Sequence, residues 1–258
     1  MPPTNASMTL SRDAGRFGLG TPAGALAAGN RLLASLPEHD LLHLTALFES
    51  VTVEVGEVLY EPGQPIGYIY FPGDCLISLL AVAEGRMTLE VGSVGREGVL
   101  GASVALGHDL AQVRAVVQRS GTASRIGRAE FCAEFAQLDS LQRLLYRYTD
   151  TLLAQAIQIA VCSRFHVLEA RLARSLLITR DRLQSEKCHL THEFLAHTLG
   201  VRRVGVTKAA SALQQQKLIT YSRGNIEILD SAGLEAVSCR CYALVKDSGP
   251  IGMANVFV

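Results

Sequence analysis

Short apolar runs separated by glycine turns fill the chain from Val51 to about Arg128. Runs of Val, Ile, Leu and Tyr broken in this way are typical of antiparallel strands. The intervals between them are too short for the crossover helices that a parallel α/β sheet requires. The pattern therefore predicts an antiparallel sandwich, barrel or roll in this part of the chain.

Helical spacing of apolar residues occurs on both sides of these strands. Before them, residues 30–48 have this spacing, and Pro37 is placed to begin a new helix. After them, residues 129–180 follow a helical pattern, and 168–177 start a second helical unit. We therefore expect helical segments before and after the predicted sheet.

One helical segment carries a longer repeat. Its residues alternate three and four apart, as in a coiled-coil seam: Leu138, Leu141, Leu145, Tyr148, Leu152, Gln155, Ile159, Cys162 and His166. We predict that this helix forms a parallel homodimer, through Leu141, Leu145, Tyr148, Leu152, Gln155 and Ile159. The polar Gln155 would fix the register of the two helices. The alternative is a helix that packs on the sheet of its own chain.

Residues 190–216 follow the pattern helix, short turn, helix. Thr191 is the predicted N-cap of the first helix, and Gly200 is the small residue that the tight turn needs. Two short strands then surround the turn at 222–225. Three helices followed by such a hairpin form a winged helix-turn-helix.

Charge is segregated along the chain. The 24 basic and 24 acidic residues cancel, which excludes a globally basic surface. Residues 38–109 hold eleven acids and two bases, whereas 202–226 hold five bases and no acid. Because Lys and Arg neutralise DNA phosphates, the basic segment is suited to bind DNA.

Six residues are predicted to contact DNA: Thr191, Arg202, Arg203, Thr207, Lys208 and Arg223. The two adjacent arginines lie at the start of the second helix, where side chains contact base edges. An arginine there can form two hydrogen bonds with one guanine. The neighbouring threonine suits a phosphate or a thymine methyl group, and the lysine suits a phosphate. The wing arginine can reach flanking phosphates, and the N-cap threonine can present a backbone N–H to one.

With these elements, residues 30–242 resemble the Crp/Fnr superfamily of bacterial transcription regulators. The strands of VEVGEVLYEPGQPIGYIYFPGD resemble the start of its cyclic-nucleotide-binding roll, and the long helix followed by HVLEARLARSLL resembles its dimerisation helix. The segment LTHEFLAHTLGVRRVGVTKAASALQQQKLITYSRGNIEI is similar to its helix-turn-helix and wing. The resemblance implies an α+β fold, a homodimer on a palindromic operator, and contact with RNA polymerase.

The expected organisation has five parts: a disordered tail at 1–29, a cyclic-nucleotide-binding-like sensor domain at 30–137, a dimerisation helix at 138–166, a winged helix-turn-helix at 167–245 and a flexible tail at 246–258. No apolar run is long enough for a signal peptide or a membrane span. We therefore expect a cytoplasmic protein that does not bind membranes.

The residues that the resemblance assigns to cAMP are mostly replaced. Gly101 matches the family glycine and Arg114 the phosphate-binding arginine, but Ala102 stands where a ribose-binding carboxylate belongs. Ala156 and Ile157 occupy the positions of the hydroxyls that contact adenine. We therefore expect an effector other than cAMP, with Gly101, Ala102 and Arg114 as candidate ligand positions. The alternatives are a sensor of another nucleotide, such as a cyclic dinucleotide, or a regulator controlled by partner proteins or redox.

The recognition helix also departs from the family. Arg203 matches the guanine-reading arginine, but Val204 replaces the neighbouring glutamate that accepts from cytosine. Gly205 follows and should loosen the helix by ~1 kcal/mol relative to alanine. We expect a different half-site from the usual one.

The six cysteines do not form a dense framework, so free thiols in a reducing compartment are expected. Cys239 and Cys241 are the one close pair, and a structural zinc site wants four ligands. No cysteine precedes Cys75, where the iron–sulfur branch of the family would need a cluster. His108 and His166 match haem ligands by residue type only. We predict no metal site, and the cofactor is unknown.

An enzyme is not expected. His192 and His197 resemble a zinc-protease pair, but they are five residues apart instead of four, so they do not share a helix face. A metal cluster of these two with Cys188 and His189 is the alternative. The sequence has no phosphate-binding loop, no nucleophile elbow and no dinucleotide-binding glycine motif.

Overall fold

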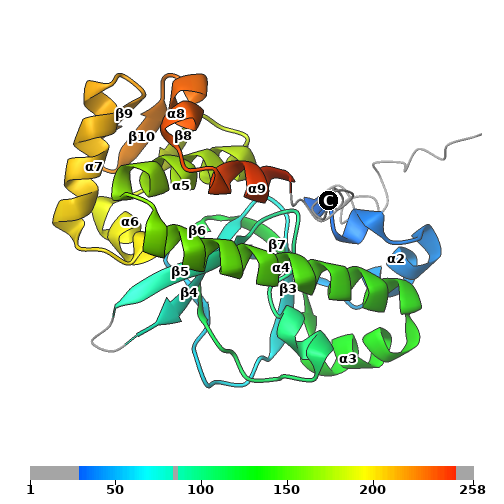
Figure 1. Ribbon diagram of the computed structural model, residues 1–258. Helices are drawn as coiled ribbons and strands as arrows, with labels where there is room; N and C mark the ends of the chain where they lie inside the picture. Colours follow the sequence, from blue (N-terminus) through cyan, green and yellow to red (C-terminus); the bar gives the residue numbers. More distant parts are fainter. Residues whose placement is uncertain (1–28, 84–86, 248–258) are drawn as a thin grey trace, which may run out of the picture.

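The computed structural model describes residues 29–83 and 87–247 (Figure 1). The tails predicted at 1–29 and 246–258 lie almost entirely outside the described residues. The first described elements are η1 (Leu33–Ser35) and α2 (Glu38–Thr45), and Pro37 precedes α2 as its N-cap residue. The fixed φ of proline suits a helix start, and this position agrees with the predicted one.

An antiparallel β-roll follows. Its strands are β1 (Glu49–Val53), β2 (Val58–Tyr60), β3 (Tyr68–Pro72), β4 (Leu76–Val82), β5 (Thr88–Val94), β6 (Arg114–Arg119) and β7 (Gly121–Gly127). They form one sheet in the order β1-β7-β3 and a second in the order β2-β6-β4-β5, with η3 (Ala102–Leu106) between β5 and β6. Alternating apolar side chains such as Ile69, Phe71, Ile77 and Ile126 fill the core. The predicted roll is confirmed.

Two helices link the roll to the C-terminal domain. They are α3 (Arg128–Gln137) and the long α4 (Asp139–Phe165), which runs across the roll (Figure 1). Leu141, Leu145 and Tyr148 of α4 are buried in the core of this roll. This helix therefore completes the roll of its own chain.

The prediction that these residues form a dimer seam is therefore wrong, because this face of α4 is not free to contact a second chain. Leu141, Leu145 and Tyr148 are enclosed by the roll, and Leu152 packs against the same core. Gln155 and Ile159 line a pocket against the C-terminal domain. The repeat in the sequence marks a buried face, but it does not say whether the buried face contacts a partner chain or its own sheet.

The C-terminal domain is a winged helix-turn-helix, as predicted. Its elements are α5 (Leu168–Leu183), β8 (Lys187–His189), α6 (His192–Leu199), α7 (Arg203–Gln215), β9 (Ile219–Ser222), β10 (Asn225–Ile228), α8 (Ser231–Val237) and α9 (Cys241–Asp247). The wing is a sheet in the order β8-β10-β9. Leu172, Leu176, Val206 and Leu213 belong to a core separate from that of the roll. The α+β fold class is confirmed, although α9 extends two residues past the expected boundary at 245.

In the described part of the chain, every helix is too short or too polar to cross a bilayer.

The inward face of α4 can be tested by truncation. Leu145 is fully buried in the roll. Leu145→Ala should lower the free energy of unfolding by about 2–5 kcal/mol, measured by chemical denaturation, because it opens a cavity. Leu42→Ala, at an exposed position of α2, is the control and should change it by less than about 0.5 kcal/mol. Similar small effects from both variants would contradict the burial of this face.

Candidate nucleic-acid interface

The turn between α6 and α7 is built by two local features. The Thr191 hydroxyl accepts a hydrogen bond from the Phe194 N–H at 3.1 Å, which confirms the predicted N-cap of α6. Gly200 ends α6 with φ +64, a backbone conformation that favours glycine. Helix α7 then begins at Arg203, with Arg202 as its N-cap residue. The sequence positions of cap and turn thus place both arginines at the start of the second helix.

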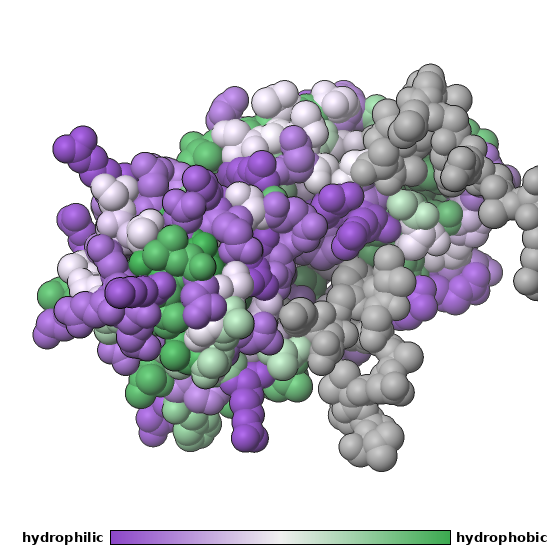
Figure 2. Space-filling view, turned by 90° about the horizontal axis from the view of Figure 1, so that it is seen from above, coloured by the Kyte–Doolittle hydropathy of each residue, from purple (hydrophilic) through white to green (hydrophobic). Residues whose placement is uncertain are grey.

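Helix α7 has one buried and one exposed face. Val206, Ala209, Ala210 and Leu213 pack into the domain core. The opposite face exposes Arg202, Arg203, Val204, Thr207 and Lys208. The predicted DNA-contacting residues of this helix therefore share one solvent face. Hydrophilic side chains project from the end of the molecule that carries α7, on the left of Figure 2.

The wing places one further predicted residue at a tip. Arg223 lies between β9 and β10 with φ +48, and Gly224 follows with φ +87. Two successive positive φ values are typical of the tight hairpin turns that glycine allows. A Cβ at Gly224 would lie 2.8 Å from the His189 ring, so the turn has no room for a side chain. The exposed Arg223 side chain therefore projects from the end of the wing.

None of Arg202, Arg203, Lys208 and Arg223 forms an ion pair within residues 29–83 and 87–247. Their positive charges are thus left to solvent or to an anionic partner. An exposed cation without an ion-pair partner can bind a nucleic-acid phosphate and release the counterions of that phosphate. This face is therefore suited to bind a nucleic-acid backbone.

His192 of α6 connects this helix with α7 and with the wing, and the sequence pattern did not reveal this role. Its ring stacks on Tyr221 of the wing with centroids 4.0 Å apart, and its Nδ1 lies 3.0 Å from the Thr207 hydroxyl. The same hydroxyl lies 3.1 Å from the Arg203 carbonyl oxygen, to which it donates. Desolvation and the charge of Arg203 lower the pKa of His192. A histidine at the first position of α6 and an aromatic residue in the wing strand were the available signals.

The alternative metal cluster around His192 is not formed in the structure. His189 Nδ1 lies 2.9 Å from Asn225 Oδ1, and His197 Nδ1 lies 3.2 Å from Thr88 Oγ1. These histidines therefore have different partners, one in the wing and the other in the β-roll. Cys188 is partly buried against the core.

The β-roll contacts the helix-turn-helix directly. Thr88 of β5 donates to the His197 carbonyl oxygen at 3.2 Å, and a Cβ at Gly200 would lie 3.1 Å from Leu89. Met87 and Thr88 line a groove whose other wall includes Arg202 and Arg203. Met87 and the start of β5 therefore lie beside the start of α7.

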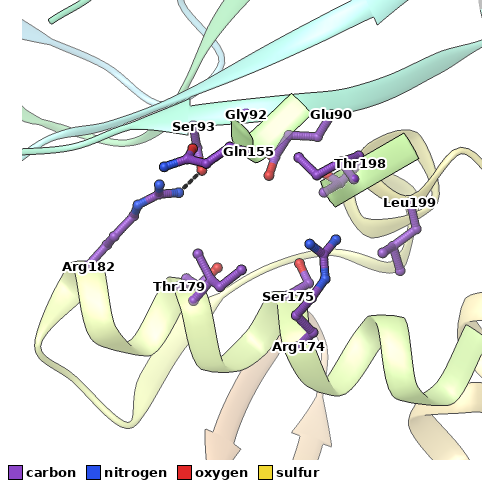
Figure 3. A pocket seen from close by; sticks show the side chains of 12 residues that line it. Glu90, Gly92, Ser93, Gln155, Arg174, Ser175, Thr179, Arg182, Thr198 and Leu199 are labelled. Atoms are coloured by element: carbon purple, nitrogen blue, oxygen red, sulfur yellow. Dashed lines mark hydrogen bonds between the residues drawn. The ribbon is translucent and has the colours of Figure 1, made fainter. Parts of the chain in front are cut away.

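A polar pocket lies between the β-roll and the C-terminal domain (Figure 3). Its lining comes from β5, α4, α5 and α6, and includes Glu90, Ser93, Gln155, Arg174, Arg182 and Thr198. Arg182 donates to Glu97 at 3.0 Å and also to Ser93, so an arginine of the C-terminal domain binds two side chains of the β-roll. These polar contacts join the two domains.

Glu90 reaches into the same pocket. Desolvation raises the pKa of its carboxyl group, while a hydrogen bond with Ser78 and the charges of Arg182 and Arg174 lower it. The net direction is upward, so the folded protein holds this proton more tightly than the unfolded chain does.

The candidate effector residues do not form an open anion site. Arg114 is held by the Glu61 carboxylate, with contacts of 3.0 and 2.9 Å. Ala102 is buried, and a Cβ at Gly101 would lie 2.7 Å from the Tyr60 hydroxyl. An anionic ligand at Arg114 would therefore have to compete with the charge of Glu61. Of the histidines matched to haem ligands by type, His108 is exposed and His166 lies beside Cys241.

Comparison with known proteins agrees with this architecture. Residues 170–237 match the family model of the Crp-like helix-turn-helix domain. No protein of curated function matches the sequence closely enough to indicate relatedness.

Solved structures of similar fold include three regulators. FixK2 from Bradyrhizobium japonicum has 15% identity and a TM-score of 0.65, covering 74% of this chain and 98% of its own. A transcriptional regulator of the Crp/Fnr family from Thermus thermophilus has 23% identity and a TM-score of 0.59, with coverage of 74% and 98%. CLP from Xanthomonas campestris, described as a c-di-GMP responsive global regulator, has 16% identity and a TM-score of 0.62, with coverage of 74% and 99%. At these identities the similarity establishes the fold.

The pKa of Glu90 predicts a pH dependence of stability. Because the folded state holds this proton more tightly than the unfolded chain, stability falls as pH rises from the unfolded value of about 4.3 through the folded one. Glu90→Gln should therefore lose less stability than the wild type as the pH rises above about 4.3, measured by denaturation at a series of pH values. The exposed Glu169→Gln is the control and should keep the wild-type slope. A Glu90→Gln protein that is less stable than wild type at pH 7 would show that ionised Glu90 stabilises the arginines instead.

Proposed function

We propose that this chain, with a Crp-like helix-turn-helix domain on the fold of Crp/Fnr-family regulators, is a sequence-specific DNA-binding transcription regulator. The observation that carries the proposal is the exposed face of α7, where Arg202, Arg203, Thr207 and Lys208 lie together. Residues 202–226 contain five bases and no acid. The chain acts by binding DNA in the cytoplasm and meeting RNA polymerase there, and we propose no catalysis.

The side chains of this face have different roles. Arg203 is the first residue of α7 and reads a guanine, because recognition helices present their N-terminal residues to base edges. Lys208 lies more than one turn later and contacts a phosphate. Thr191 and Arg223 bind phosphates from the first helix and from the wing, as a helix N-terminus and a wing tip are placed to do.

The regulator acts as a homodimer through the outward face of α4. Leu153, Ile157 and Val161 are 60%, 58% and 42% exposed and lie four residues apart. Such a stripe on one helix is the kind of surface that a second copy covers. A two-fold dimer would present two recognition helices about one DNA turn, ~34 Å, apart on a palindromic operator.

The effector is proposed to be something other than cAMP, because Glu61 already neutralises Arg114 and Ala102 offers no carboxylate. A cyclic dinucleotide remains a candidate, and the similar CLP responds to c-di-GMP according to its description. A regulator without a small-molecule effector, controlled by protein partners or redox, is the second candidate. The ion pair between Arg114 and Glu61 favours the second candidate.

Base reading by Arg203 can be separated from phosphate binding. Arg203→Ala should weaken binding to the selected operator by ~1–3 kcal/mol and relax the preference at one base pair. Lys208→Ala is the matched control, and it should weaken binding to all duplexes and lower the salt slope by about one unit. Fluorescence anisotropy on the operator and on random duplex measures both. An Arg203→Ala loss that is equal on the two duplexes would rule out base reading.

The outward face of α4 is tested by placing a charge in it. Ile157→Asp should weaken the dimer by about 3 kcal/mol or more, ~100-fold in dissociation constant, because the carboxylate would be buried without a partner. Sedimentation at micromolar concentration should then show a monomer. Leu42→Asp, at a similarly exposed position of α2, should remain a dimer. Unchanged dimerisation by Ile157→Asp would refute this interface.

A further inference from the structure

Four metal-ligating side chains meet where the end of α4 approaches the end of the C-terminal domain. Cys162 lies in the last turn of α4, and His166 is the residue directly after it. Cys239 lies between α8 and α9, and Cys241 is the first residue of α9. Three Sγ atoms and one imidazole nitrogen, one from each residue, all lie within 4.8 Å of one another.

The spacing of these atoms fits a single tetrahedral ion. Cys162 Sγ lies 3.5 Å from Cys239 Sγ, and Cys241 Sγ lies 3.4 Å from His166 Nδ1. Zinc bonds of ≈ 2.3 Å to sulfur and ≈ 2.0–2.1 Å to nitrogen place tetrahedral ligand atoms about 3.5–3.8 Å apart. A four-iron cluster between the same ligands would hold the sulfur atoms further apart than observed.

The backbone brings the ligands together from two distant segments. Cys162 and His166 are four residues apart, so they lie on one side of the helix end. Cys239 and Cys241 flank a single residue at the turn into α9, and α9 lies along α4 (Figure 1). The three thiols are buried and His166 is partly exposed. Such an enclosed set leaves no open coordination position, which is the arrangement of a structural site.

The surrounding charges favour an anionic centre. Arg171 and Arg174 are buried, and both interact electrostatically with Cys162. The Nε of Arg174 is buried without a hydrogen-bond partner among the described residues. A Zn²⁺ with three thiolates and a neutral histidine carries one negative charge, which compensates for buried cations. Gln158 Nε2 also donates to Cys241 Sγ at 2.8 Å, as groups around a metal site commonly do.

We propose that Cys162, His166, Cys239 and Cys241 bind one Zn²⁺ in tetrahedral coordination. The ion cross-links the C-terminal end of α4 to the segment between α8 and α9. It thereby fixes the orientation of the winged helix-turn-helix relative to the helix that forms the proposed dimer. The sequence predicts no metal site because Cys239 and Cys241 are its one close pair of cysteines. The other two ligands lie more than 70 positions away in sequence.

The metal content of the purified full chain tests this proposal. Protein prepared without chelators, or supplied with ZnCl₂ and desalted, should contain about one zinc per chain by mass spectrometry of the metal. Cys239→Ser should reduce this value at least tenfold. Cys132→Ser, which removes an exposed cysteine outside the cluster, is the matched control and should retain one zinc.

A second measurement does not depend on the folding of a variant. Wild-type protein loaded with Co²⁺ should show the intense visible bands of tetrahedral cobalt and the near-ultraviolet bands of cobalt–thiolate bonds. Zinc should displace the cobalt and abolish these bands. The absence of bound zinc and of tetrahedral cobalt bands would overturn the proposal. So would stoichiometric iron in place of zinc, or a Cys162–Cys239 disulfide in protein prepared under reducing conditions.

Discussion

The packing of α4 is the constraint on which the rest of the structure depends. This one helix of 27 residues completes the core of the roll near its start and lines the inter-domain pocket in its second half. Tyr148 is buried in the roll, whereas Gln155 and Ile159 face the C-terminal domain. Because a straight helix transmits its orientation along its length, the position of the recognition helix depends on how α4 sits on the roll. Its outward face exposes Leu153, Ile157 and Val161, through which the proposed dimer would form.

Polar contacts connect the β-roll with the helix-turn-helix on the inner side of α4. Arg182 joins the C-terminal domain to Glu97 and Ser93, and Thr88 joins the hairpin to the end of α6. Polar contacts between domains can break and re-form at lower cost than an apolar core. For the proposed regulator, a signal that acts on the β-roll must favour one arrangement of these contacts over another to alter DNA binding. The same condition applies to a ligand, a partner protein or a thiol modification.

The parts of the structure with local signals were predictable from sequence. Thr191 and Gly200 fix the two ends of α6, and Gly224 fixes the wing turn, because each residue acts on its own backbone neighbourhood. The roll was predictable for the same reason, since its strands are short and separated by turns. These features identified the start of the recognition helix to within a residue.

The features that depend on distant partners were not predictable. The inward face of α4 and its outward face both carry apolar residues, and only the three-dimensional contacts show that Leu145 faces the roll and Ile157 faces solvent. The stack of His192 on Tyr221 joins residues from two separate elements. The Cys162–Cys239 contact joins residues 77 positions apart. Such pairs leave no periodic signal in a single sequence.

The most direct test of the central claim is a footprint of the full chain on duplex selected from random DNA. The account predicts two protected half-sites centred about 10 base pairs, ~34 Å, apart on one side of the duplex, with protected guanines in the major groove of each. Failure to enrich any sequence, or a single protected site without two-fold symmetry, would contradict a dimer that reads DNA through the exposed face of α7.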